Sequence, residues 1–318
     1  MKKRSDKGNT KIVPDGATYR SVINICAQFG LVEDAMKAFR LMTIGFQSGN
    51  EEVKPDLMAF NTVLKAHRNN TDENAATVAL QFLREMEKLY EAGALDFRPD
   101  AYTVLAAFAN EKHNRPKVAT RAYKLLREMK EKVKDGGAEP NTVCYNAVLN
   151  AWARARNPEQ TALILKEMQD EYMAGNKLVK PDHMSFNSLL KAWAYSLRKD
   201  SGEQGARVIE TMHQLSDEGI LDCEPSVVSY TTYILCYGLS KHPDGPARSD
   251  EILRKMKELN QAGKMEPPSY VTYKTLKRVW LGSDRPDKYE RVNQINEESR
   301  AAGFTTGKQR RTTRTATC

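Results

Sequence analysis

Apolar residues recur along the chain at helical spacing, in the same order about every 40 residues. In six segments a helical run ends in a methionine, with a large apolar residue three positions earlier and a small residue seven positions earlier. These methionines are Met42, Met86, Met129, Met168, Met212 and Met256. Positions i, i+4 and i+7 share one face of a helix, so each segment predicts an amphipathic helix, here called helix B.

A second helix, helix A, is predicted ahead of each helix B. It follows a proline, carries an aromatic residue five positions after that proline and has apolar residues three and four positions further on. The prolines are Pro14, Pro55, Pro99, Pro140, Pro181, Pro225 and Pro268, spaced by 41, 44, 41, 41, 44 and 43 residues. The aromatic residues are Tyr19, Phe60, Tyr145, Phe186, Tyr230 and Tyr273.

Each pair of helices forms a hairpin that cannot bury its apolar face alone, whereas stacked neighbours bury a continuous core. We therefore predict an all-α fold, a right-handed α-solenoid of about seven stacked helical hairpins. The array covers residues 12–303, and its units start near residues 14, 55, 99, 140, 181, 225 and 268. Turns between helices A and B are expected at Gly30, Asn157–Pro158, Gly202 and Pro243–Gly245.

The net positive charge of the chain lies at its two ends. The net charge is +8, yet residues 1–11 and 307–318 each contribute +4, so the body between them is neutral. Residues 1–11 and 304–318 are expected to be basic, disordered ends. A nucleic-acid partner would therefore require positive charge gathered on one face of the neutral body.

Several classes of protein are disfavoured by the sequence. No apolar run approaches the roughly 18 residues of a membrane span. The five cysteines form no Cys-x-x-Cys pair, which argues against disulfides and a zinc site and favours a reducing compartment. The five histidines are scattered singly, and Gly303–Lys308 has the wrong spacing for a phosphate-binding loop. We expect no catalytic activity, no metal and no cofactor.

The starts of the A helices carry a more specific signal. One reads Pro55-Asp56-Leu57-Met58-Ala59-Phe60-Asn61-Thr62-Val63-Leu64, and another reads Pro181-Asp182-His183-Met184-Ser185-Phe186-Asn187-Ser188-Leu189-Leu190. With the terminal methionine of helix B, these segments resemble pentatricopeptide repeats of the P class. The units are longer than the family's standard repeat. The extra residues fall between the methionine and the next proline, where we expect a longer helix B or loop.

The resemblance implies that single-stranded RNA is read at one base per repeat, by the residue after the aromatic and the residue after the next proline. The pairs are Asn61 with Asp100 and Asn146 with Asp182 for U, Asn187 with Ser226 for C, Thr231 with Ser269 for a purine and, under one alignment, Thr103 with Asn141 for A. Apolar residues three past the proline would wedge between bases: Met58, Val143, Met184, Val228 and Val271. Phosphate contacts are expected from Lys65, Arg154 and Lys191. The asparagines could instead be hydrogen-bonding residues at helix N-termini that bind no ligand.

The implied biology is the stability, processing or translation of RNA in a mitochondrion or plastid, although no clear transit peptide is visible. Other RNA-processing proteins are possible partners, no membrane association is expected, and the chain is expected to be a monomer. A second hypothesis keeps the same solenoid but makes its concave face a scaffold for protein partners.

Overall fold

The computed structural model describes residues 14–69, 75–97, 104, 105, 108, 115–240 and 242–304. It divides into two compact units, residues 1–155 and 156–318. Within the described ranges every regular element is a helix, so the predicted all-α fold of repeated hairpins is confirmed. The expectations for residues 1–11, for the tail after residue 304 and for most of helix A in the third unit lie outside the described residues.

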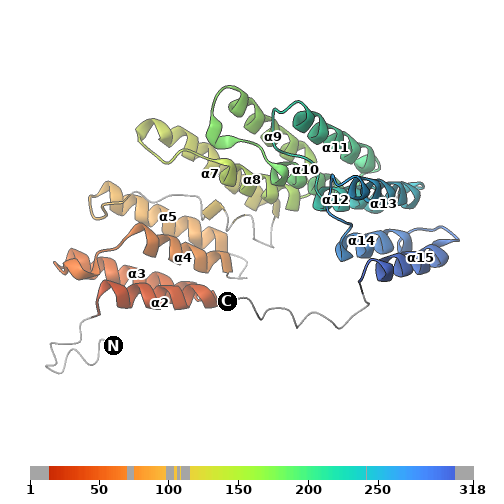
Figure 1. Cartoon of the computed structure of the whole chain (residues 1–318). Coiled ribbons are helices and arrows are strands. Elements are labelled where there is room, and N and C mark those ends of the chain that lie inside the picture. The colour runs from red at the N-terminus through yellow and green to blue at the C-terminus, as the bar shows by residue number, and fades with distance from the viewer. Residues whose placement is uncertain are drawn as a thin grey trace. The chain divides into compact units, whose positions relative to one another are not determined.

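Among the described residues of the first unit are two hairpins and two further helices, and Figure 1 shows how they lie. Helix α2 (Gly16–Phe29) pairs with α3 (Val32–Gln47), and α4 (Leu57–Asn69) pairs with α5 (Ala75–Glu91). The B helix of the third repeat is α7 (Arg115–Lys132), and it packs against the next A helix, α8 (Thr142–Arg154).

The second unit begins with α9 (Pro158–Met173), a B helix, and continues through three hairpins (Figure 1). These are α10 (His183–Ser196) with α11 (Ser201–Asp217), α12 (Val227–Leu239) with α13 (Gly245–Gln261), and α14 (Tyr270–Leu281) with α15 (Lys288–Ala301). The prediction of a turn at Gly202 is wrong, because Gly202 lies inside α11. A Cβ atom at this position would come within 2.3 Å of the Tyr237 ring, so the glycine permits close packing of α11 on α12.

The repeated apolar positions form the core as predicted, except that Tyr19, the aromatic of the first A helix, is only half-buried. All six terminal methionines of the B helices are buried, and so are the small and large residues that precede them. On helix A the aromatics Phe60, Tyr145, Phe186, Tyr230 and Tyr273 are at most 4% exposed. In the first unit, Phe60 also stacks on Phe82 with ring centroids 5.5 Å apart and meets the edge of Phe39. This burial is the main force that holds each hairpin to its neighbours.

The residues between each methionine and the next proline, where a longer helix B or a longer loop was predicted, form the end of helix B and the loop after it. Helices α3, α5, α9, α11 and α13 run five residues past their methionine. Short 3-10 turns follow three of the B helices: η1 (Glu51–Val53), η2 (Val133–Asp135) and η3 (Lys177–Val179). Seven residues after each methionine stands a glycine with positive φ: Gly49, Gly93, Gly136, Gly175, Gly219 and Gly263. Only glycine adopts this left-handed conformation without strain, so the Met-to-Gly offset fixes where helix B ends.

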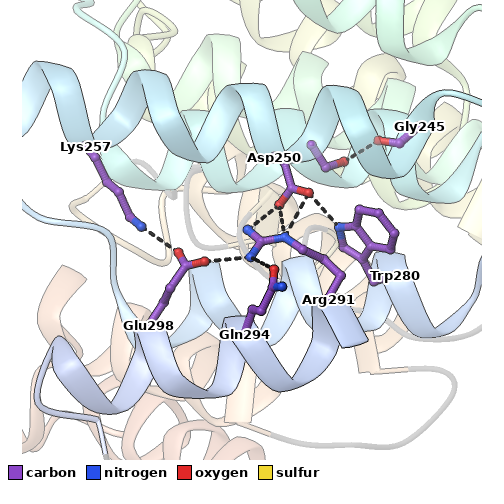
Figure 2. Close-up of polar contacts among 8 residues, drawn as sticks. Gly245, Asp250, Lys257, Trp280, Arg291, Gln294 and Glu298 are labelled. Atoms are coloured by element: carbon purple, nitrogen blue, oxygen red, sulfur yellow. Dashed lines mark hydrogen bonds and ion pairs between the residues drawn. The ribbon is translucent and has the colours of Figure 1, made fainter. Parts of the chain in front are cut away.

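Ion pairs join successive B helices within each unit. In the first unit Arg40 on α3 pairs with Glu85 on α5, and Arg84 on α5 pairs with Glu128 on α7. Figure 2 shows the densest network, which joins α13 to α15. There Asp250 accepts hydrogen bonds from Arg291 at 2.8 Å and from the Trp280 indole at 3.1 Å, and Glu298 joins Arg291 to Lys257.

Replacing Arg291 with alanine should lower the free energy of unfolding by about 2–3 kcal/mol. The change leaves the Asp250 and Glu298 carboxylates, 25% and 28% exposed, without their shared cation. Chemical denaturation followed by circular dichroism measures the loss. The control is Arg254→Ala on α13, since Arg254 is 74% exposed and its pair with Glu258 should contribute less than about 0.5 kcal/mol. Equal losses for the two variants would contradict this account of the network.

The same network makes a pH-dependent contribution. Burial alone would raise the pKa of Glu298, but hydrogen bonds from Lys257 and Arg291 outweigh burial and hold it below its ordinary value of 4.5. Because the pKa is lower in the folded chain than in the unfolded one, the stabilisation is present above pH 4.5 and is lost as the pH falls through the folded-state pKa.

Candidate nucleic-acid interface

The second residue of five A helices is a large apolar side chain that faces solvent. These residues, the wedge series, are Met58, Val143, Met184, Val228 and Val271. They are 57–72% exposed, whereas the aromatic residue two positions later on each helix is buried. Core packing does not explain why the same position of five A helices is both apolar and exposed. Exposed apolar patches often mark binding surfaces.

The residue directly before each described A helix caps that helix. The Asp15 carboxylate accepts a hydrogen bond from the Thr18 amide, and Asp56 accepts one from the Ala59 amide. The Asn141 side chain accepts from the amides of Val143 and Cys144. Capping boxes are formed by Asp182, Ser226 and Ser269. Residues that the resemblance assigns to base reading therefore also satisfy the free amides of a helix N-terminus.

Reading positions of one repeat lie next to each other in spite of the longer units. In the first repeat Arg20, one residue past the aromatic, pairs with Asp56, one residue past the next proline, at 3.4 Å. In the sixth repeat the Thr231 hydroxyl lies 2.8 Å from that of Thr272, which in turn lies 3.2 Å from the Ser269 hydroxyl. The extra residues lie at the end of helix B and not at the start of helix A. They therefore do not separate the N-termini of neighbouring A helices.

The three asparagines at the first reading position, Asn61, Asn146 and Asn187, are all half-buried. Asn187 is the most informative, because its Oδ1 atom is buried and accepts no hydrogen bond among the described residues. A buried acceptor without a partner is costly, so it favours an external donor at this point.

Thr231 does not fit the role that the sequence suggested. It is 8% exposed, and its hydroxyl lies 2.6 Å from the Val227 carbonyl and 2.8 Å from the Thr272 hydroxyl. These internal hydrogen bonds hold the Thr231 side chain between α12 and α14, so its hydroxyl is used within the protein. We therefore leave it out of the proposed site. Two other predicted readers, Asp100 and Thr103, lie outside the described residues.

The three predicted phosphate contacts lie in different surroundings. Lys65 on α4 is exposed, and Lys191 on α10 is half-buried. Arg154 ends α8, and its Nε atom is buried without a hydrogen-bond partner among the described residues. Burial and the nearby Arg115 lower the pKa of Arg154. Lys65 is thus the one of the three that is most open to a backbone phosphate.

Sequence reasoning missed two features of the site. The Arg20–Asp56 pair joins residues 36 positions apart, and only the repeat register could have aligned them. The capping role of the residue after each proline was open to prediction, since Asp, Asn and Ser are the residues preferred at helix N-caps.

The described residues contain no helix long and apolar enough to cross a membrane. Across the same residues no three His, Cys, Asp or Glu side chains come together in a way that could hold a metal ion. Phe304 corrects the expected boundary of the C-terminal tail, because its ring lies 6.2 Å from Tyr270 and 6.1 Å from Tyr273.

Comparison with known proteins agrees with this architecture. The family profile for the pentatricopeptide repeat domain matches residues 124–196, and the profile for the PPR repeat matches residues 17–43. A pentatricopeptide repeat-containing protein of Arabidopsis thaliana is 30% identical over 125 residues, which is 39% of this chain and 19% of that protein. This chain therefore spans about a fifth of that relative's length.

One solved structure gives the same result for the fold. The crystal structure of the pentatricopeptide repeat protein PPR10 from maize aligns with a TM-score of 0.54 and 19% identity, over 94% of this chain and 36% of that one. PPR10 in complex with an 18-nucleotide psaJ RNA element aligns with a TM-score of 0.49 and 17% identity, over 95% and 42% of the two chains.

The hairpin register, the buried methionine stripe and the capped A helices define an α-helical repeat protein of the solenoid type. Together with the two matching profiles, they make the chain similar to pentatricopeptide repeat proteins over residues 17–43 and 124–196.

Proposed function

We propose that the chain binds single-stranded RNA along the first turns of its A helices. The main support for this proposal is the wedge series, because one exposed apolar side chain lies at the same position of five A helices. Stacking of a base against such a side chain is tolerant of sequence and contributes about 1–3 kcal/mol per base. Polar residues beside the wedges would then select the base through hydrogen bonds to its edge.

The proposed readers are Asn61, Asn146 and Asn187 with the capping residues Asp182 and Ser226. An asparagine amide offers both a donor and an acceptor, which matches the mixed edges of the pyrimidines. A capping carboxylate or hydroxyl keeps its helix amides satisfied while it lies beside the reading position, as the contact between Arg20 and Asp56 illustrates. The similarity to pentatricopeptide repeat proteins further supports a role in the stability, processing or translation of organellar RNA, together with other RNA-processing proteins.

Fluorescence anisotropy with short RNAs at physiological salt tests the proposal. The panel holds a randomised pool, a U-rich strand, an A-rich strand and DNA of the same sequences. We expect RNA to bind better than DNA, with a preference for pyrimidines. Contacts with three phosphates would give a slope of about −2 for log affinity against log salt. A folded chain that binds none of these strands at micromolar concentration would contradict the proposal and favour the protein scaffold.

A single reader can be tested in the second unit. Asn187→Thr should shift the preferred base at its position from a pyrimidine towards a purine, with a change of about tenfold in relative affinity. The measurement is anisotropy with four RNAs that differ only at that base. Asn293→Thr on α15 is the matched control, since Asn293 is an exposed asparagine on a B helix. Equal weakening on all four RNAs would contradict one-base reading by Asn187.

A further inference from the structure

Two members of the wedge series differ from the others in their chemistry. Met58 and Met184 carry a thioether sulfur, whereas the remaining three wedges are valines. The two methionine side chains are 72% and 57% exposed, so small molecules in the solvent can reach them. A thioether takes up one oxygen atom to form methionine sulfoxide, which is polar and chiral. The wedge series therefore contains two positions at which oxidation would change the surface that is offered to a base.

The fold protects most of the other methionines that the structure describes. Met265 is half-buried, and Met173, at the end of α9, is 65% exposed but lies on a B helix outside the wedge register. Among the described methionines, exposure therefore singles out Met58, Met173 and Met184, and two of these three are wedges. The remaining seven are at most 7% exposed: Met36, Met42, Met86, Met129, Met168, Met212 and Met256.

The cysteines of the described residues do not compete for the same oxidant. Cys26, Cys144, Cys223 and Cys236 are all buried. Burial raises the pKa of the Cys223 thiol to about 11, so this thiol stays protonated at neutral pH. Since the thiolate is the form that reacts with peroxides, a buried and protonated thiol is inert. On the described part of the chain, the accessible sulfur is thus that of the exposed methionines.

We propose that Met58 and Met184 are reversible oxidation sites, and that their oxidation weakens the RNA binding proposed above, on which this inference rests. Hydrogen peroxide is the oxidant. Its O–O bond breaks, one oxygen forms an S=O bond with the thioether sulfur, which loses two electrons, and the other oxygen leaves with both protons as water. Methionine sulfoxide reductases restore the thioether with electrons from thiols. An exposed position admits both the oxidant and the reductase.

The effect on binding follows from the position of the two side chains. A thioether is apolar and polarisable, so it stacks favourably against the face of a base. A sulfoxide oxygen accepts hydrogen bonds from water, and insertion between two bases would remove that water without replacing it. Folding carries no such cost, because both side chains already face solvent. Oxidation should therefore weaken RNA binding by at least roughly tenfold and leave the helical content unchanged.

Treatment of the full chain with hydrogen peroxide, followed by mass spectrometry of its peptides, tests the sites themselves. We expect Met58, Met173 and Met184 each to gain one oxygen atom, whereas the seven buried methionines should react only after unfolding. A methionine sulfoxide reductase should return both wedges to the thioether. A pyrimidine-rich RNA that is present during treatment should protect Met58 and Met184 but not Met173. Wedges that resist oxidation in the folded chain, or that bound RNA fails to protect, would overturn the proposal.

Anisotropy with the same RNA, in dithiothreitol to reverse cysteine oxidation, gives the affinity before and after treatment. The double variant Met58→Leu, Met184→Leu keeps two apolar wedges without sulfur, so it should bind like the wild type and lose no affinity on treatment. Met173→Leu is the matched control, and its affinity should fall as the wild type's does. Equal losses in all three chains, or no loss in the wild type, would overturn the proposal. An untreated chain that binds no RNA would instead contradict the proposed function, and this inference with it.

Discussion

Replacing Met184, Val228 and Val271 with alanine in one chain should weaken binding to single-stranded RNA by at least roughly 100-fold. Each wedge would supply stacking of about 1–3 kcal/mol, and about 1.4 kcal/mol corresponds to a factor of ten in affinity. These side chains are 57–62% exposed, so folding should be little affected. Anisotropy titrations with a pyrimidine-rich RNA measure the loss, and circular dichroism checks the fold.

The control for this variant removes an equal number of exposed apolar side chains from other registers of the same unit. Leu163, Leu178 and Tyr289 are 59%, 53% and 67% exposed, and none lies on an A helix. Their joint replacement by alanine should leave RNA affinity within about twofold of the wild type. If both triple variants lost the same affinity, the wedge register would have no special role.

Phe60→Ala should be the most destabilising single substitution in the first unit, at about 3–5 kcal/mol. The ring is fully buried, stacks on Phe82 at 5.5 Å and lies 6.1 Å from Phe97 on the chain that follows α5. Its removal leaves a cavity at the point where two hairpins meet, and the rigid A and B helices cannot close that space. Thermal and urea unfolding, followed by circular dichroism, give the change in stability.

Met58→Ala separates this effect from binding. Met58 lies on the same helix two residues before Phe60, but it is 72% exposed. We expect its replacement to change stability by less than about 0.5 kcal/mol and to weaken RNA binding. A small loss of stability for Phe60→Ala, similar to that for Met58→Ala, would show that the aromatic cluster does not hold the first two hairpins together.

Much of the fold could be predicted because a single physical requirement repeats. Each hairpin must bury one face, so the pair of a large apolar residue and a methionine, as in Phe39 with Met42 and Leu83 with Met86, recurs through the sixth unit. The ion pairs between B helices could not be found this way. Arg40 and Glu85 are 45 residues apart, and both also suit an ordinary exposed helix surface. Gly202 was misplaced because a glycine that permits close packing looks like a turn signal in sequence.

The candidate site was only partly predictable. The wedge positions are exposed in the structure, whereas their role in stacking stays a prediction. Asp, Asn and Ser suit a helix cap as well as they suit a base edge, so the sequence could not show that Asp182 and Ser226 form capping boxes. Thr231 was misjudged because its partner, Thr272, lies on the next repeat and is placed beside it only by the packing of the two A helices.

The most direct test of RNA binding at the A helices is photo-crosslinking of the full chain to an RNA that contains 4-thiouridine, with mass spectrometry of the linked peptides. We expect cross-links in the first turns of the A helices, at residues 57–61, 142–146, 183–187, 227–231 and 270–274. Cross-links confined to the B helices, or equally frequent on both kinds of helix, would contradict the proposal that RNA runs along the wedge series.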